Sequence, residues 1–138
     1  MSGNAVEEPR HTAEVTARVR LASGPLARPV LCRVVSMVLA RADWPINRLD
    51  DAMLACDALC AHAYDHASDG RITLDVCARD GALELRVGGL APDGAAALLR
   101  DARLPGVGNV LEHVAERLAI EPDEQNGGSQ LVLVISSS

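Results

Sequence analysis

Three segments of the chain alternate between apolar and polar residues, and this period of two predicts half-buried strands. In residues 14–22 the odd-numbered positions are apolar and most of the even-numbered positions are polar. Residues 71–78 and 82–87 alternate in the same way, and the Asp-Gly pair at 80–81 between them is a strong signal for a β-hairpin. Residues 130–135 predict a last strand.

Two long helices are predicted between the first strand and the hairpin. Apolar residues recur at helical spacing from Pro25 to Ala42, which predicts the first of them. The second is predicted to begin with Asn47 as its cap and to run to about Ala67. Its first turn contains acidic residues, which the helix dipole favours.

The segment after the hairpin predicts two more helices and two loops. A short helix is expected over residues 95–103, and a third long helix from the glycine-rich turn at 106–109 through Leu118. Residues 88–94 and 121–128 are predicted loops, because glycine, proline and polar residues cluster there.

Strands grouped in this order predict an α+β fold. We expect a two-layer sandwich, in which a mixed but mostly antiparallel sheet carries helices on one face. The chain has 138 residues, 49% of them hydrophobic, which suffices for one domain with a core. This domain is predicted over residues 13–138, after a flexible tail at 1–12.

Charge and aromatic content argue against a nucleic-acid partner. The formal net charge is −6, all fixed positive charge is on arginine, and aromatic residues make up 1% of the chain. Nucleic-acid binding needs clustered positive charge and usually aromatic stacking surfaces, and the sequence contains no basic run.

A cytoplasmic location without membrane contact is predicted from the apolar runs and the cysteines. No stretch of about eighteen apolar residues is present, and the first fifteen residues lack the apolar core of a signal peptide. Four cysteines without a secretion signal indicate reduced thiols in a cytoplasm.

Chemistry-bearing side chains gather on the second predicted helix. On a helical wheel Cys56 and Cys60 fall in its apolar stripe, whereas Ala58, His62 and His66 form a second stripe in another direction. Because the thiols and imidazoles diverge, this helix alone excludes a tetrahedral zinc site. The two histidines, four residues apart, still have the spacing to share a metal, but the glutamate of a hydrolytic HExxH motif is absent.

Three segments share their order and spacing with the signature blocks of a known family. They are LACDALCAHAYDHASDGRITL at 54–74, PGVGNVLEHVAERLA at 105–119 and GGSQLVLVI at 127–135. These segments resemble the blocks of the anti-sigma-factor serine kinases, in the GHKL superfamily of histidine-kinase-like ATPases. The resemblance extends over about residues 14–136 and implies the histidine-kinase-like, or Bergerat-type, ATPase fold.

The resemblance also implies a nucleotide site, in which two main groups are replaced. In the family a glutamate activates the substrate hydroxyl, and an asparagine one turn later holds Mg²⁺ against the phosphates of ATP. The matching positions here are Ala58 and His62. Alanine cannot accept a proton, and neutral imidazole is a poor ligand for Mg²⁺, which prefers oxygen.

The other nucleotide positions are matched in part. Gly89 stands where the family has the aspartate that binds the adenine amino group. Gly106 and Gly108 match the phosphate-binding glycine loop, whose alternative interpretation is a turn and cap. Ser129 matches a threonine near the nucleotide, and His66 matches a histidine at the helix end.

These replacements predict a regulator that keeps the fold and loses kinase activity, with binding of ATP or ADP and Mg²⁺ weakened. The implied partners are a sigma factor, a STAS-domain anti-anti-sigma factor, or both. A homodimer through the exposed part of residues 14–42 is also implied. Two alternatives stay open: an active kinase that uses His62 in a rearranged pocket, and a metal- or redox-responsive domain that uses His62, His66 or the cysteines.

Overall fold

A computed structural model describes residues 14–125 and 127–137, so the tail predicted at 1–12 lies outside the described residues. The strands are β1 (Val15–Ala22), β2 (Arg71–Arg79), β3 (Ala82–Leu90), β4 (Arg103–Leu104), β5 (Gly108–Asn109), β6 (Arg117–Asp123) and β7 (Gly128–Ser136). The α-helices are α2 (Ala27–Arg41), α3 (Leu49–His62), α4 (Gly94–Asp101) and α5 (Val110–Val114). Short 3₁₀ segments flank α3, namely η2 (Ile46–Arg48) and η3 (Ala63–His66).

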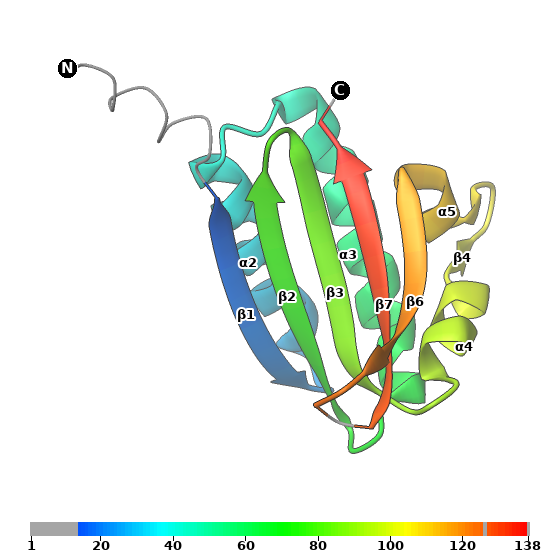
Figure 1. The fold of residues 1–138 in the computed structure, drawn as a ribbon. Coiled ribbons are helices and arrows are strands. Elements are labelled where there is room, and N and C mark those ends of the chain that lie inside the picture. Colours follow the sequence, from blue (N-terminus) through cyan, green and yellow to red (C-terminus); the bar gives the residue numbers. More distant parts are fainter. Residues whose placement is uncertain (1–13, 126, 138) are drawn as a thin grey trace.

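Five strands form one sheet in the order β1-β2-β3-β7-β6 (Figure 1). Each neighbouring pair is antiparallel, so within the described residues this sheet lacks the parallel component of the mixed sheet that we predicted. The predicted hairpin is confirmed: β2 and β3 are joined at Asp80 and Gly81, whose φ angles are 50° and 75°. Positive φ at both positions is what a type I′ turn requires.

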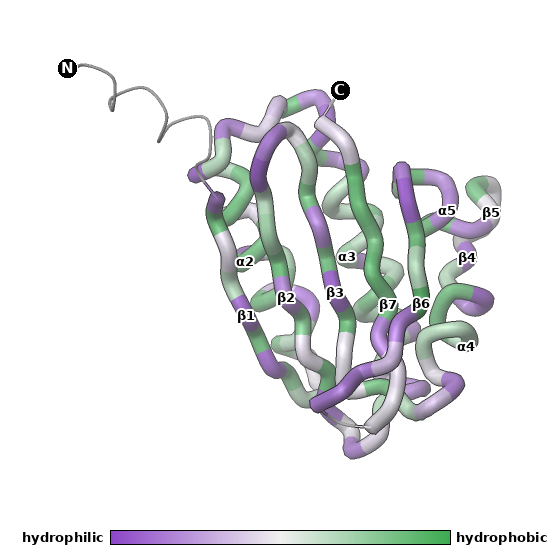
Figure 2. Tube along the Cα trace, in the orientation of Figure 1, coloured by the Kyte–Doolittle hydropathy of each residue, from purple (hydrophilic) through white to green (hydrophobic). Residues whose placement is uncertain are grey.

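All the helices of the described residues lie on one side of the sheet, and none of them covers the other face (Figure 1). The predicted α+β architecture with helices on one face is therefore confirmed. Along β1, β2 and β3, hydrophobic and hydrophilic residues alternate (Figure 2), as expected for a sheet with one buried and one open face. Among the described residues, no helix has the length and apolar character that a membrane span needs.

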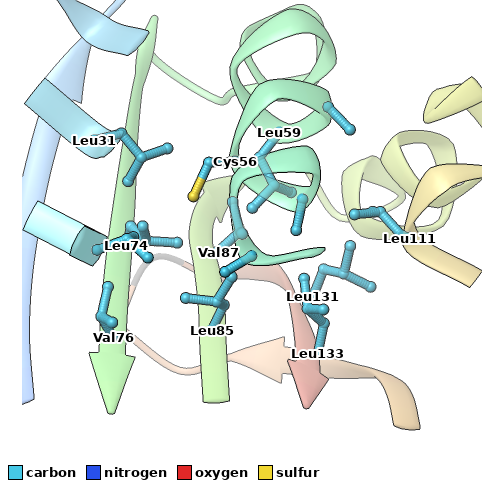
Figure 3. Packing of buried hydrophobic residues seen from close by; sticks show 14 of the residues in the cluster. Leu31, Cys56, Leu59, Leu74, Val76, Leu85, Val87, Leu111, Leu131 and Leu133 are labelled. Atoms are coloured by element: carbon cyan, nitrogen blue, oxygen red, sulfur yellow. The ribbon is translucent and has the colours of Figure 1, made fainter. Parts of the chain in front are cut away.

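The core lies between the sheet and the helices. Leu74 and Leu85 from the sheet meet Leu31 of α2 and Leu59 of α3 in one cluster of buried side chains (Figure 3). Each of these leucines is at most 1% exposed. Burying a leucine side chain contributes about 1.5–3 kcal/mol, so this cluster is the main source of stability that the sequence pattern encodes.

The third long helix predicted through Leu118 is wrong. The helix that forms, α5, ends at Val114, and β6 begins at Arg117. Its start is as expected, because the side chain of Asn109 accepts a hydrogen bond from the backbone N–H of Glu112 at 3.0 Å. Residues 115–119 have good helix propensity, but β7 offers an antiparallel partner all along 117–123, and this long-range pairing prevails.

The second helix begins later than predicted. Asn47 lies inside η2, and the residue before α3 is Arg48, which makes no side-chain cap. The Arg48 guanidinium instead donates to the carbonyl oxygen of Ser136 at 2.9 and 3.1 Å and pairs with Asp51 at 2.8 Å. These contacts join the start of α3 to the end of β7. The position at which α3 begins is therefore determined by tertiary contacts.

The two predicted loops are shorter than expected. β3 continues through Leu90, with an irregularity in its pairing to β7 between Val87 and Leu90. β6 continues through Asp123. Both extensions arise because the β6–β7 hairpin folds against the end of β3, a contact that local sequence patterns do not report.

Candidate functional site

The predicted site is centred on α3, which is buried on two sides. Cys56 and Leu59 are both fully buried, as the predicted apolar stripe requires. Ala58, from the second stripe, is also buried, with 2% of its surface exposed. The second stripe is therefore part of the core at Ala58 because α4 and α5 pack beside α3 (Figure 1).

Leucine side chains fill the layer between α3, α5 and the sheet. Leu111 reaches from α5 toward α3, near Leu131 and Leu133 of β7 (Figure 3). These three residues and Leu98 of α4 are all fully buried in the same cluster as Ala58. The helix side of the sheet beside Ala58 is thus packed with hydrocarbon.

Five of the surface hollows along the described residues are well formed, and none of these five is lined by Ala58, His62 or His66. Four open on the sheet face that carries no helix, and their lining includes Arg18 or Arg86. The fifth lies between the end of α2 and the β2–β3 turn.

His66 and Ser129 form hydrogen bonds that hold together the segments at the end of the helix layer. The hydroxyl of Ser129 accepts from the backbone N–H of Ala95 at 2.9 Å and donates to the carbonyl oxygen of Ala91 at 2.7 Å. The backbone N–H of Ala91 donates to the carbonyl oxygen of His66 at 2.9 Å. The Ser129 side chain is therefore committed to the start of α4, and it ties β7 to the segment beside His66.

The imidazole ring of His66 also contacts α4. Its Nε2 atom lies 2.7 Å from Oδ2 of Asp101, at the C-terminal end of α4. α3 ends at His62, where φ is −125°, and His66 follows on the 3₁₀ turn η3. A 3₁₀ helix has three residues per turn and an α-helix has 3.6. The imidazole rings of His62 and His66 therefore do not lie on one common face, as they would on an uninterrupted α-helix.

Gly89 forms part of a β-bulge. Its φ is +80°, and a Cβ atom there would approach the carbonyl oxygen of Arg71 to 2.9 Å, so glycine is the residue that fits. Its N–H donates to Oδ2 of Asp123 at 3.1 Å, and its carbonyl oxygen accepts from Ser68 at 2.8 Å. Asp123 is 7% exposed and bonds Gly89 across from the β6–β7 hairpin.

Gly106 and Gly108 belong to the small β4–β5 hairpin. Their φ angles are +81° and +85°, and open space surrounds both positions. The helix that follows has five residues, so its amides and dipole offer less to a phosphate than the long helix that we predicted. The turn-and-cap interpretation accounts for both glycines.

The structure brings together three of the six position-matched residues. His66, Gly89 and Ser129 meet where η3, the end of β3 and the start of α4 are hydrogen-bonded to one another. Within the described residues, no hydrogen bond links His62, Gly106 or Gly108 to this group. Sequence patterns gave no indication of Asp101 or Asp123, whose partners lie 35 and 34 residues away.

Burial is the main cause that raises the pKa of the cysteine thiols, so we expect them to react slowly. Burial raises the pKa of Cys60 to about 11, and it raises the pKa of the deeply buried Cys56 further. The pKa of Cys32 is also raised, mainly by burial. In the part of the chain that the structure describes, no three of the histidine, cysteine and acidic side chains are close enough together to hold a metal ion.

Cys60 is expected to react with iodoacetamide roughly twentyfold more slowly at pH 8 than a free cysteine peptide. At pKa 11 on the order of 0.1% of the thiol is thiolate, against roughly a quarter for an ordinary cysteine, and higher intrinsic nucleophilicity offsets part of this loss. The rate should rise with pH towards 11, because the thiolate is the form that reacts. Mass spectrometry of labelled peptides measures this, and labelling as fast as the free peptide would contradict the burial of Cys60.

Comparison with known proteins finds no match, either among protein-family models or among curated proteins.

Proposed function

We propose that this protein is a non-catalytic, protein-binding regulator of the anti-sigma type. It binds a sigma factor or a STAS-domain antagonist through its surface and does not turn over ATP. The observation that carries this proposal is the burial of Ala58 at 2% exposure inside a leucine-packed layer. The position that would hold a catalytic base is thus part of the hydrophobic core.

The chemistry of phosphoryl transfer supports the same proposal. Transfer needs a group that accepts the hydroxyl proton, an oxygen ligand for Mg²⁺ and a cleft that excludes water. Ala58 supplies no base, and His62 offers nitrogen in place of oxygen. The hydroxyl of Ser129 is engaged with backbone groups of Ala91 and Ala95. These residues do not fit a magnesium nucleotide, so no catalytic step is assigned to it.

The outer side of α2 supports a protein contact. Leu26, Val30 and Met37 are 71%, 36% and 49% exposed, and they recur along this helix and the turn before it. Apolar side chains exposed together on one element are typical of interaction sites. We propose that this side of α2 receives the sigma factor or the STAS-domain partner.

Capture of partners in the absence of nucleotide tests the proposal. The tagged full chain, incubated with cell extract, should retain a sigma factor or a STAS-domain protein, identified by mass spectrometry. A purified retained protein should then bind with a Kd that 1 mM MgATP leaves unchanged within about twofold. The variant Met37→Glu should weaken binding, whereas Val107→Glu, at a position that is 42% exposed on the turn between β4 and β5, should not.

Isothermal titration with MgATP separates this proposal from an active kinase. We expect no measurable heat of binding. Micromolar affinity, or phosphate transfer to the captured partner that is lost in His62→Ala, would favour a kinase with a rearranged pocket and overturn the proposal. Retention of neither partner class would overturn it as well.

A further inference from the structure

The free edge of β6 carries a sequence that complements itself. β6 pairs with β7 on one side and with no other strand among the described residues, so its outer edge is open. Its residues 117–121 read Arg-Leu-Ala-Ile-Glu. When the segment is read in reverse, with Ala119 at its centre, the positions of the cation and the anion are exchanged. The two large apolar residues also exchange positions.

Antiparallel pairing about Ala119 would match every side chain in this segment. Arg117 of one copy would lie opposite Glu121 of the other, and Leu118 opposite Ile120, each pair twice by symmetry. Arg117, Ala119 and Glu121 share the open face of the sheet, because they are directly opposite Val134, Val132 and Gln130 of β7. Opposite charges and apolar pairs at such positions each stabilise paired strands.

The side chains of this segment are exposed to the extent expected of a strand edge that a second strand would cover. Ile120 is 50% exposed, although it is a large apolar residue on a strand. Arg117 is exposed and makes no ion pair among the described residues. Glu121 uses Oε1 for Arg86 at 2.9 Å and for Gln130 at 3.3 Å, which leaves Oε2 for a further cation.

On the opposite edge of the sheet, the corresponding register about the middle of the strand sets like charges against each other. On β1, Arg18 and Arg20 point to the same open face, and antiparallel pairing centred on Val19 would set the arginines of two copies against each other. Like charges directly opposite destabilise a strand pair. Asp75 and Asp69 pair with these two arginines but belong to the same chain, so they would not hold a second copy.

We infer that two copies of this chain associate by antiparallel pairing of β6 with β6, to form one continuous sheet. Such a contact is isologous, because the same residues serve both copies. It does not depend on the proposed function. It replaces the dimer contact on residues 14–42 that the resemblance implies, and it leaves α2 free for a different protein. A contact through five residues is small, so we expect a dissociation constant in the micromolar range.

Charge reversal tests the pairing by analytical ultracentrifugation of the full chain. Arg117→Glu should raise the dimer dissociation constant at least tenfold, because the introduced carboxylate would then face Glu121 of the other copy. Glu121→Arg should do the same, since it would set two guanidinium groups against each other. Mixed in equal amounts, the two variants should form a heterodimer, since every charged pair is then complementary, and the double variant should recover the homodimer.

Two controls keep the result interpretable. Urea unfolding of each variant reports whether the monomer is folded, because Glu121→Arg also removes a partner of Arg86. Met37→Glu on α2 should leave the β6 dimer intact. A monomer at 1 mM, a dimer that the β6 variants do not affect, or a dimer that Met37→Glu abolishes would each overturn the inference.

Discussion

Replacing Ala58 by glutamate is expected to lower the free energy of unfolding by roughly 3–5 kcal/mol, the cost of an uncompensated buried charge. The substitution restores the residue type that the resemblance implies for a catalytic base. Because Ala58 is 2% exposed and lies in the leucine cluster, the carboxylate would be placed in hydrocarbon. Urea unfolding followed by circular dichroism measures the change.

Ala61→Glu is the matched control for this prediction. Ala61 is exposed on the same helix, so its replacement should change stability by less than about 0.5 kcal/mol. If Ala58→Glu proved as stable as Ala61→Glu, a solvated cleft would have to exist beside α3. The proposed loss of the nucleotide site would then be wrong.

Truncation of Leu111 to alanine is expected to cost about 2–5 kcal/mol, as for other fully buried leucines. Leu111 is 0% exposed and projects from α5 toward α3 (Figure 3). Its loss leaves a cavity lined by apolar side chains between α5 and α3, and we expect MgATP titration to show no binding to this space. The denaturation midpoint should fall while the m-value stays constant.

Val107→Ala provides the comparison for Leu111→Ala. Val107 is 42% exposed on the β4–β5 hairpin, just before α5, and its truncation should cost less than about 0.5 kcal/mol. Equal effects of the two substitutions would mean that α5 does not pack against α3 as described.

The hairpin at 80–81 and the amphipathic helix α2 could be predicted because their signals are local. Asp80 and Gly81 suit positive φ, and the strands beside them alternate with a period of two. The boundary of α5 could not be predicted in this way. Residues 115–119 favour a helix by propensity, and only the position of β7, which lies further along the chain, explains why β6 forms instead.

The candidate site shows the same limit. The helical wheel placed Cys56 and Ala58 in different directions, and both side chains are buried in the structure. Whether the side with Ala58 faces a cleft or a core depends on α4 and α5, which lie beyond the β2–β3 hairpin in the chain. Packing of Leu98 and Leu111 against α3 decides this question, and no periodicity within α3 reports it.

The arginines on β1 have a consequence for how far association can proceed. A sheet with two attractive edges would add copies without limit and grow into a fibre. In the inferred dimer the first pair occupies both β6 edges, and pairing of β1 edges about Val19 would set the arginines of two copies against each other, so this register does not extend the sheet further.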